Sequence, residues 1–539
     1  MLDNSTAITH TKVVTPEGVN NLADLLEDSF QKFATLPAYT CLGTSLSYAD
    51  IDKQSHSLAC WLQHHSGLQA GDRVAIQLPN LLQYPIAAYA VLRADMVIVN
   101  TNPLYTPSEM QHQFKNAGVK AVIILDEHVS KLTQIIDDTD IDTVVVTHVG
   151  ELLDDSKTAP KVAPINATSS SISFTQALLD GQGQTLAPRN AGMDDICLLQ
   201  YTGGTTGVSK GAALDHRNML SNAVQLIDRF GEHCQQGRET YICPLPLYHI
   251  YAFMVNVITE ASMGNHTVLI PNPRDLDSFI VAMSNVKFTG FAGINTLFVG
   301  LCQHPEFPKL DFSHLKLTIS GGSTLTSATA ELWRKVTGCT ISEAYGLSET
   351  SPVLTFNFPG KEEIGSVGFP LIGTEIQFWN DDDEAVADGE EGQLVARGPQ
   401  VMRGYWKMPT ETEKVLTADG WFKTGDIGKR LPSGAIKIVD RLKDMIIVSG
   451  FNVYPNQVED VLTQHQHVLE AAVVGEQDDK TGERVCAYIT VSQPISQEEM
   501  IAFCREQLTA YKVPKKVIIL DELPKSTVGK ILRRALRSE

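Results

Sequence analysis

The sequence predicts an α/β protein in which a large N-terminal part is followed by a small α+β part. Short apolar runs, such as residues 74–78 and 120–126, alternate with segments of helical periodicity, which is typical of a parallel sheet with connecting helices. A charged stretch, DRLKD at residues 440–444, separates two further apolar runs and indicates an exposed hinge. We therefore expect a large domain at residues 1–440 and a small one at residues 441–539.

One helical face and three apolar runs define the first expected elements. Residues 22–33 place five apolar side chains at helical spacing, namely Leu22, Leu25, Leu26, Phe30 and Phe33. The apolar run at residues 74–78 ends at a proline, which indicates a strand. A helical pattern at residues 109–117 leads into a strand at residues 120–126, and residues 143–149 are a further apolar run. Helices and buried strands therefore alternate, and this favours parallel strands.

The next elements surround two stretches of loop-like composition. Residues 150–190 are polar and rich in Ser, Thr, Ala and Pro, so we expect a surface connection between subdomains. A strand at residues 196–201 then enters a glycine-rich loop, and helical spacing follows at residues 219–230. We expect the last hundred residues to form strand, strand, helix and strand, with Ser496 and Glu499 as a capping box at the start of the helix.

The composition excludes several classes of protein. The chain has 539 residues, of which 43% are hydrophobic and 20% charged, so a large core is available and wholesale disorder is excluded. The formal net charge is −20, whereas a protein that binds nucleic acid over its whole surface is positively charged. We therefore expect no nucleic-acid partner. The nine cysteines form no C-x-x-C pair, which indicates neither a zinc site nor a disulfide framework.

The hydropathy pattern also bears on location. No stretch reaches the roughly 18 uncharged apolar residues that span a bilayer, and the richest candidate, residues 86–99, contains Arg93 and Asp95. The N-terminus lacks the basic and apolar regions of a signal peptide. We therefore expect a cytoplasmic chain, with peripheral contact at the inner face of the cell membrane left open. The sequence does not determine the oligomeric state, and a dimer is among the states that it allows.

One loop has a composition that points to phosphate. Residues 201–211, YTGGTTGVSKG, contain four glycines, three threonines, a serine and Lys210. Glycines let backbone N–H groups converge on an anion, hydroxyls add donors and the lysine adds charge, so the loop predicts a polyphosphate cradle. The G-x-x-x-x-G-K-[ST] spacing of P-loop proteins is absent, and a flexible loop is the alternative that composition leaves open.

Five motifs in one order carry a family resemblance. They are the glycine-rich loop, YGLSET at 345–350, TGD at 424–426, DRLKD at 440–444 and PKSTVGKILRR at 524–534. With them the chain resembles the adenylate-forming superfamily, which includes acyl-CoA synthetases, firefly luciferases and adenylation domains of peptide synthetases. Segments such as NPLYTP, PLPLYHIYAF and GINTLF are similar to bacterial long-chain fatty acid CoA ligases in particular. The resemblance covers nearly the whole chain and implies a large adenylate-forming domain of α/β subdomains with a mobile C-terminal lid.

The resemblance implies a nucleotide site built from these motifs. Its residues are Tyr201, Thr202, Gly203, Gly204, Thr205, Thr206, Gly207, Val208, Ser209, Lys210, Gly211, Ala212, Gly322, Ala344, Tyr345, Gly346, Thr350, Asp426 and Arg441. Asp426 would accept the ribose hydroxyls and Tyr345 would face adenine, although a turn and a core tyrosine are the plainer alternatives. Glu349 would bind Mg²⁺ with help from Thr202, since both offer hard oxygen ligands.

The remaining site residues are also implied by the resemblance. Lys530 would be the catalytic lysine that bridges the attacking carboxylate and the α-phosphate, and Lys443 would be the hinge. The acyl pocket would include Tyr248, His249 and Gly293, for which ordinary core packing is the alternative. The path of CoA would pass Ser449, Gly450 and Phe451. A fatty carboxylate is already ionised at neutral pH, so His249 is not expected to act as a base.

The function implied is that of a long-chain fatty acid CoA ligase. It would use ATP and Mg²⁺ to form an acyl adenylate with release of pyrophosphate, and would then transfer the acyl group to CoA with release of AMP. A ligase for medium-chain or aryl acids and an acyl-AMP ligase that loads a carrier protein are the alternatives. A nucleotide- or fatty-acid-binding protein without catalytic activity is disfavoured because all five charged site residues are present. They are Lys210, Glu349, Asp426, Arg441 and Lys530.

Overall fold

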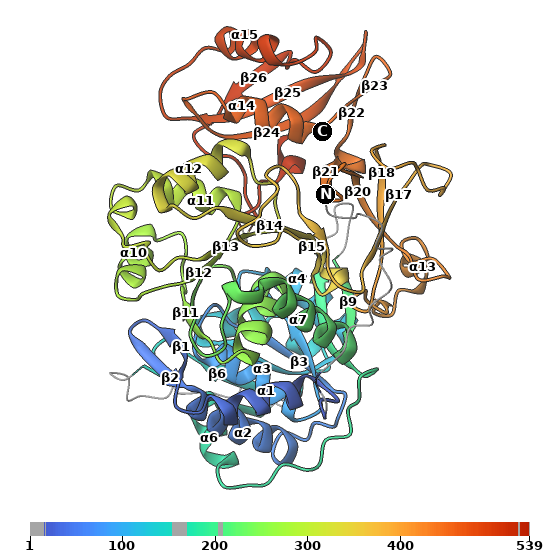
Figure 1. Ribbon diagram of the computed structural model, residues 1–539. Coiled ribbons are helices and arrows are strands. Elements are labelled where there is room, and N and C mark those ends of the chain that lie inside the picture. Colours follow the sequence, from blue (N-terminus) through green and yellow to red (C-terminus); the bar gives the residue numbers. More distant parts are fainter. Residues whose placement is uncertain (1–15, 17, 154–169, 203–208, 527–528, 538–539) are drawn as a thin grey trace, which may run out of the picture.

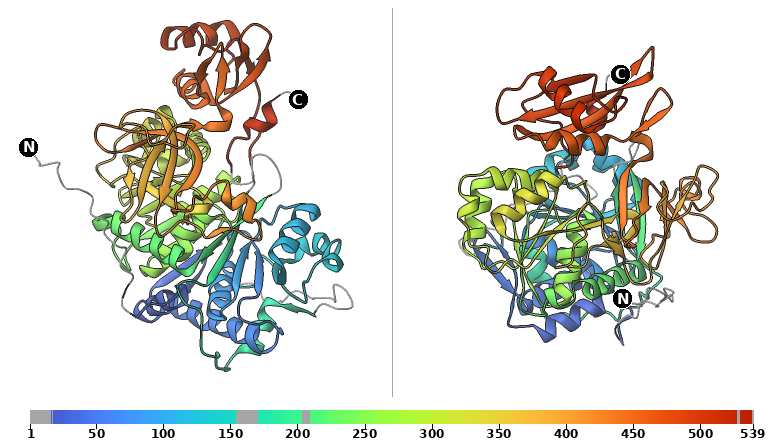
Figure 2. Two further views of the ribbon diagram at one scale, coloured as in Figure 1. Left: turned by 90° about the vertical axis from the view of Figure 1, so that its right-hand side faces the viewer. Right: turned by 45° about the horizontal axis from the view of Figure 1, so that its top comes forward.

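The structure, a computed structural model, describes residues 16, 18–153, 170–202, 209–526 and 529–537. Figure 1 shows a large lower part that contains the N-terminal half of the chain and a small upper part formed by the C-terminal residues. Figure 2 shows the small part as a separate layer at one end of the molecule. The architecture is the mixed α/β arrangement that the sequence predicts.

The first sheet of the large part has eight strands. In spatial order they are β19 (Gly404–Tyr405), β9 (Lys210–Asp215), β8 (Ile196–Thr202), β4 (Val97–Asn100), β3 (Arg73–Gln77), β5 (Val119–Leu125), β6 (Thr143–Thr147) and β7 (Ser170–Ser173). All pairs from β8 to β7 are parallel, whereas β8–β9 and β9–β19 are antiparallel. The predicted parallel strands are therefore confirmed for most of this sheet.

Helices join and cover these strands. They are α1 (Leu22–Lys32), α2 (Tyr48–His64), α3 (Gln83–Arg93), α4 (Pro107–Ala117), α5 (Val129–Thr133), α6 (Phe174–Gly181) and α7 (His216–Phe230). The helices expected from apolar spacing, α1, α4 and α7, are confirmed. Helix α4 begins at a reciprocal capping box of Thr106 and Glu109 and ends at Gly118, whose φ of 68° is one that glycine adopts without strain.

The expectation for residues 150–190 was wrong in part. Residues 154–169 lie outside the described residues, but β7 pairs with β6 in parallel and α6 follows it directly. The strand has the sequence SSIS, and so few apolar residues give no strand signal. Its pairing depends on the neighbouring strand β6, which is buried along its whole length.

The second sheet of the large part has nine strands. Their order is β16 (Phe369–Pro370), β15 (Val353–Phe356), β14 (Ile341–Gly346), β13 (Leu317–Ser320), β12 (Gly290–Gly293), β10 (Thr240–Cys243), β11 (His266–Leu269), β1 (Pro37–Cys41) and β2 (Thr44–Ser47). Its helices are α8 (Ile250–Ala252), a π-helical stretch at Phe253–Thr259, α9 (Glu260–Ser262), α10 (Leu276–Ser284), α11 (Asn295–Gln303) and α12 (Ser327–Thr337). The carboxyl ends of β13 and β14 lead into the segments that contain Gly322 and Glu349.

A four-stranded antiparallel sheet completes the large part. It consists of β17 (Glu375–Trp379), β18 (Gly392–Arg397), β20 (Phe422–Arg430) and β21 (Ile436–Arg441), with the short helix α13 (Pro409–Glu413) between β19 and β20. A 3-10 turn at Leu442–Asp444 follows β21 and contains the expected hinge residue Lys443. Lys443 therefore lies directly after this sheet, and its role as a hinge remains a prediction.

The C-terminal part has a sheet and a core of its own. Its strands are β22 (Ile446–Val448), β23 (Phe451–Val453), β24 (Val468–Asp478), β25 (Gly482–Val491) and β26 (Lys516–Ile519), and its helices are α14 (Pro455–Thr463) and α15 (Gln497–Gln507). Their apolar side chains form two buried clusters, the larger of which includes residues of α14 and α15. The predicted helix after Ser496 is confirmed, but the expected order omitted α14 and two strands. The boundary at residues 440/441 remains a prediction.

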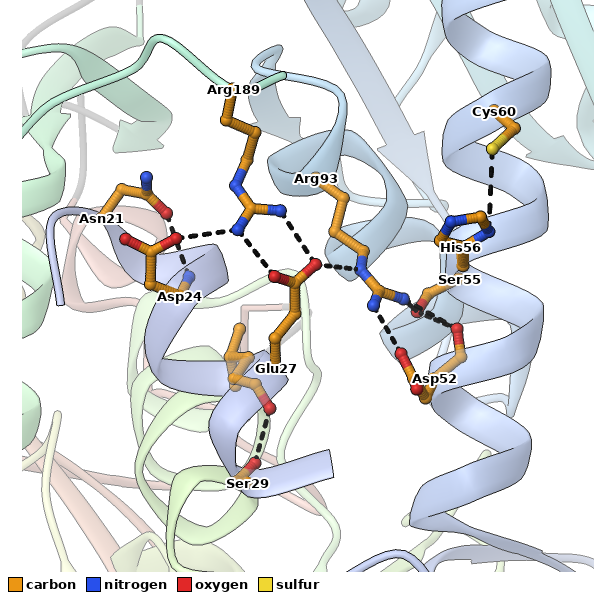
Figure 3. A network of polar contacts seen from close by, with 11 residues as sticks. Asn21, Asp24, Glu27, Ser29, Asp52, Ser55, His56, Cys60, Arg93 and Arg189 are labelled. Carbon is orange, nitrogen blue, oxygen red and sulfur yellow. Dashed lines mark hydrogen bonds and ion pairs between the residues drawn. The ribbon is translucent and has the colours of Figure 1, made fainter. Parts of the chain in front are cut away.

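An ionic network, shown in Figure 3, ties the first three helices together. Arg93, at the end of α3, donates to Glu27 of α1 at 2.8 Å and pairs with Asp52 of α2. Arg189 binds both carboxylate oxygens of Glu27, at 2.8 and 2.6 Å, and Asp24 at 2.8 Å. Arg93, which breaks the richest apolar stretch of the sequence, is thus buried and paired. Within the described residues, no helix combines the length and the apolar character that crossing a bilayer requires.

Candidate active site

A cavity of about 2480 Å³ lies between the large part and the C-terminal part. Side chains from β8, β9, β14, β20 and β21 line it, and α14 and the segment around Lys530 close it from the C-terminal side. Most of the predicted site residues meet here, namely Tyr201, Thr202, Ser209, Lys210, Tyr248, His249, Gly322, Ala344, Tyr345, Gly346, Glu349, Asp426, Arg441, Lys443 and Lys530. The cavity therefore gathers motifs that lie more than 300 residues apart.

Tyr405 connects Lys210 and Glu349. Strand β19 pairs with β9, which places Tyr405 opposite Ala212, and the Lys210 ammonium lies 5.1 Å from the centre of the Tyr405 ring. The Tyr405 hydroxyl donates to Glu349 Oε1 at 2.8 Å, and the Lys210 ammonium also pairs with the carboxylate of Glu411. Burial raises the pKa of Glu349, and the hydrogen bond from Tyr405 opposes that rise.

Asp426 occupies the wall formed by β20 and β21. The two strands place Asp426 directly opposite Arg441, whose Nε lies 3.2 Å from Asp426 Oδ1. The Tyr345 hydroxyl donates to Asp426 Oδ2 at 2.6 Å. Burial raises the pKa of Asp426, while the Arg441 guanidinium favours the ionised form. A buried carboxylate with two oriented oxygens is thus held at the cavity wall.

Lys530 projects from the C-terminal segment towards Gly322. A Cβ atom added to Gly322 would lie 3.4 Å from the Lys530 ammonium, so the absent side chain leaves room for the lysine. Burial and the positive charge of Arg441 lower the pKa of Lys530 to about 8. Burial and the charge of Lys530 lower the pKa of His249 to about 3, so this imidazole is neutral. Lys530 is one of several positive groups with which the C-terminal part lines the cavity.

Two of the contacts that dock the C-terminal part on the large part lie near Lys530. Asp460 of α14 accepts hydrogen bonds from the backbone N–H and the hydroxyl of Ser327, at 3.0 and 2.9 Å, at the first residue of α12. The Thr296 hydroxyl donates to the carbonyl of Gly529 at 3.0 Å. Within the C-terminal part, Arg533 pairs with Glu459 at 2.7 Å and so holds the Lys530 segment against α14.

Several predicted site residues lie elsewhere. Gly203, Gly204, Thr205, Thr206, Gly207 and Val208 lie outside the described residues. Among the described residues that line the cavity, Gly211, Ala212, Thr350, Gly293, Ser449, Gly450 and Phe451 are not found.

Packing accounts for three of these positions. A Cβ atom on Gly211 would lie 2.9 Å from the ring of Tyr201, and one on Gly293 would lie 2.8 Å from the ring of Phe298. The Thr350 hydroxyl is buried and accepts from the Leu347 backbone at 3.0 Å, which shapes the turn that bears Glu349. These residues take part in the packing around the site and do not line the cavity.

The residues expected along the path of CoA are exposed in this structure. Ser449 and Gly450 form the turn between β22 and β23, with φ angles of 52° and 83°. Phe451 is 56% exposed and stacks on Tyr511, with ring centres 4.8 Å apart. Tyr511 itself lines the cavity, so the expected CoA residues lie just outside it.

Sequence reasoning missed Tyr405, Glu411, Asp460 and Ser327. Tyr405 belongs to a strand of only two residues, and nothing in the local sequence RGYW indicates its pairing with β9. Glu411 and Asp460 lie on polar helices where carboxylates are ordinary surface residues. Their partners are more than 100 residues away, so no local spacing could have found them.

The oxygen ligands of Glu349 and Thr202 suit a Mg²⁺ ion whose other ligands come from substrate and water. Among the residues that the structure describes, no group of three or more His, Cys, Asp or Glu side chains could hold a metal ion. Glu349 and Thr202 nevertheless face the same cavity. Because Mg²⁺ usually keeps several waters and takes one or two carboxylates plus phosphate oxygens, this sparse set fits that ion when a nucleotide is bound.

The fold and the site define an adenylate-forming enzyme. The chain belongs to the AMP-binding enzyme family, since that family's model matches residues 26–406. A second model, the AMP-binding enzyme C-terminal domain, matches residues 457–530. The resemblance drawn from five motifs is therefore confirmed.

Individual relatives cover nearly the whole chain. A long-chain-fatty-acid–CoA ligase of Escherichia coli O157:H7 is 42% identical over 537 residues, which are 98% of this chain and 96% of that protein. The enzyme of the same name from Bacillus subtilis (strain 168) is 36% identical, over 96% and 94% of the two chains.

Solved structures share the fold. ATP-bound MatB from Rhodopseudomonas palustris is similar with a TM-score of 0.84 at 29% identity, over 96% of this chain and 98% of that one. The anthranilate CoA ligase AuaEII in complex with anthranoyl-AMP has a TM-score of 0.86 at 23% identity, over 96% of each chain, and shows a likeness of fold alone.

Proposed function

We propose that the protein is a long-chain fatty acid CoA ligase that makes acyl-CoA, AMP and pyrophosphate from a fatty acid, ATP and CoA. One observation carries the proposal. A single cavity brings together Lys210, Glu349, Asp426 and Lys530, which come from four separate segments. The near full-length similarity to enzymes named long-chain-fatty-acid–CoA ligases supports the choice of substrates.

The first step joins the fatty acid to AMP. A carboxylate oxygen attacks the α-phosphorus of ATP, and the bond from that phosphorus to the pyrophosphate oxygen breaks. The carboxylate is ionised at neutral pH and needs no base, so the barrier comes mainly from bringing anions together. We assign Lys530 to neutralise the charge between the carboxylate and the α-phosphate, and Lys210 to hold the outer phosphates.

The nucleoside is held by the opposite wall. Asp426 would accept both ribose hydroxyls, and Arg441 would keep that carboxylate ionised and oriented. Ala344 and Tyr345 of β14 would lie along adenine. Glu349 and Thr202 would hold Mg²⁺, which would supply positive charge beside the phosphate oxygens.

The second step transfers the acyl group to sulfur. The thiol of CoA loses its proton to solvent, its sulfur attacks the acyl carbonyl carbon, and the bond from that carbon to the AMP oxygen breaks. Ser449, Gly450 and Phe451 lie outside the cavity in this conformation, so we propose that the C-terminal part turns about Lys443 before this step. That turn would withdraw Lys530 and bring the β22–β23 turn towards the acyl adenylate.

The decisive experiment measures pyrophosphate and acyl-CoA release with ATP, Mg²⁺ and CoA over saturated acids of about six to eighteen carbons. Acyl-CoA formation that rises with the longer acids is the expected result. A maximum at short acids would instead indicate a medium-chain ligase. Pyrophosphate exchange without acyl-CoA would indicate an acyl-AMP ligase with a carrier-protein acceptor, and no reaction at all would contradict the proposal.

We also propose peripheral contact with the membrane, because long-chain fatty acids partition into lipid. The measurement is co-sedimentation of the protein with vesicles, with and without oleate in the bilayer. We expect binding that increases with the fatty acid content, and equal recovery in the supernatant under all conditions would contradict the proposal.

A further inference from the structure

Glu411 pairs with Lys210, the residue that we assign to the outer phosphates. It belongs to α13, while Lys210 begins β9, and the two residues are 201 positions apart in sequence. The Lys210 ammonium pairs with Glu411 Oε2, and both side chains line the cavity. The two side chains are only 26% and 31% exposed. We propose that Glu411 competes with phosphate for Lys210 and thereby sets the affinity of the polyphosphate site.

The position of Glu411 is determined by the backbone around it. The Thr412 hydroxyl accepts from the Tyr405 N–H at 2.9 Å, which fastens α13 to β19. Strand β19 in turn pairs with β9, the strand that Lys210 begins. The carboxylate is therefore held next to the ammonium by two short elements. It is not a freely moving surface group.

The competition follows from charge. A carboxylate oxygen and a phosphate oxygen offer the same kind of acceptor to an ammonium group. A polyphosphate that binds Lys210 would also bring several negative charges close to Glu411, and like charges in a half-buried site repel strongly. The hydrogen bonds from Lys210 and Lys414 lower the pKa of Glu411 to about 2, so this carboxylate is ionised at neutral pH.

Lys414 provides Glu411 with a second cation, so that Lys210 can leave Glu411 for a phosphate group. Its ammonium pairs with Glu411 Oε1, three residues along the same chain segment, and its side chain is 62% exposed. When Lys210 turns to phosphate, Glu411 keeps this cation and is not left as an unpaired charge. Lys414 therefore favours release of Lys210, although it lies outside the cavity lining that the structure describes.

The test uses calorimetry of inorganic pyrophosphate and of ATP binding to the full-length protein and three variants. Glu411→Gln removes the competing charge and should tighten pyrophosphate binding about tenfold, the effect of one charge-assisted hydrogen bond. Lys414→Met removes the alternative partner and should weaken binding. Glu413→Gln, an exposed carboxylate on the same helix, is the matched control and should leave the affinity within about twofold.

The opposite signs of the two effects make the outcome decisive. Weaker binding in Glu411→Gln would show that the carboxylate orients Lys210 and would overturn the proposal, as would an effect no larger than that of Glu413→Gln. The inference rests on the proposed polyphosphate role of Lys210. Failure of that role has its own signature, since the unmodified protein would then bind neither pyrophosphate nor ATP.

Discussion

The ammonium of Lys530 is buried beside Gly322 and close to Arg441, and this position determines the pH at which it is charged. Its pKa of about 8 lies below the ordinary value of a lysine, since burial and a neighbouring positive charge both disfavour protonation. The charged form is present below this pKa and is lost as the pH rises through it. The charge of Lys530 therefore changes with pH close to neutrality.

This shift predicts the pH profile of acyl-adenylate formation. For that half-reaction, a plot of log(kcat/KM) against pH should fall with a slope of about −1 above pH 8. One proton is lost from Lys530 there, and kcat/KM reports the free enzyme. The measurement is pyrophosphate release between pH 6.5 and 10. Lys530→Arg keeps its charge at all these pH values, so whatever activity it retains should show no fall near pH 8. An identical profile in that variant would contradict the assignment.

Tyr405 connects the two groups that we assign to phosphate and Mg²⁺. Tyr405→Phe keeps the ring beneath Lys210 but removes the hydrogen bond to Glu349. A hydrogen bond to a charged group contributes about 1.5–3 kcal/mol, so we expect ATP binding to weaken at least tenfold at low Mg²⁺. Calorimetry of ATP binding at several Mg²⁺ concentrations tests this. Unchanged affinity at every concentration would show that the hydroxyl is dispensable.

At the scale of elements, helices α1, α2 and α3 are joined by charge as well as by apolar packing (Figure 3). The Arg93 guanidinium is 6% exposed and reaches Glu27, Asp52 and the Ser55 hydroxyl. A buried charge with satisfied partners adds little net stability, but removal of Arg93 takes this cation from Asp52 and leaves Glu27 with Arg189 alone. This asymmetry decides how the network responds to mutation.

Arg93→Met should therefore lower the free energy of unfolding by about 3 kcal/mol. Arg217→Met is a matched control because Arg217 pairs with Asp194 at the surface, where both side chains are about half exposed or more. Such a pair contributes roughly 1 kcal/mol or less. Urea denaturation of the two variants compares these values, and equal losses would mean that the buried network has no special role.

The same network predicts a loss of stability in acid. Burial raises the pKa of Glu27, but hydrogen bonds and charges from Arg189 and Arg93 outweigh burial and leave it below the ordinary value of 4.5. The ionised carboxylate therefore stabilises the fold above pH 4.5, and this contribution disappears as the pH falls through the lowered pKa. The difference in unfolding free energy between the unmodified protein and Glu27→Gln should shrink over that range.

At the scale of the whole molecule, Lys530 lines the same cavity as Lys210 and Asp426 because the C-terminal part is docked on the large part. Asp460 lies at the N-terminus of α12, where a carboxylate is favoured by unpaired backbone N–H groups. Burial and the charge of Asp460 raise the pKa of nearby Glu343 to about 8, so a second carboxyl group at this interface is largely neutral. The docked arrangement therefore depends on a few polar contacts.

Asp460→Ala should slow acyl-adenylate formation about tenfold, because Lys530 would reach the cavity less often. Thioester formation from supplied acyl adenylate should be largely unchanged. Lys530→Ala should abolish the first step and also spare the second. Asp479→Ala changes the same charge at an exposed site of the C-terminal part and serves as the control. Equal losses in both steps for either of the first two variants would refute separate half-reactions.

Much of the fold could be predicted from local patterns. Apolar spacing predicted α1, α4 and α7, and short apolar runs predicted β3, β5, β6 and β8, because these elements bury continuous apolar faces. The same reasoning failed for β7, which has little apolar character, and for α14, which was omitted. Elements held by their neighbours carry no such pattern in their own residues.

The sequence by itself determined the class of protein, because glycine-rich, acidic and basic motifs are contiguous residues whose chemistry is readable locally. The tertiary structure alone decided which side chains control those motifs. Tyr405, Glu411 and Asp460 act on partners 56 to 201 residues away. Such pairings arise from strand register and domain docking, which depend on the packing of the whole chain and not on the spacing of any one segment.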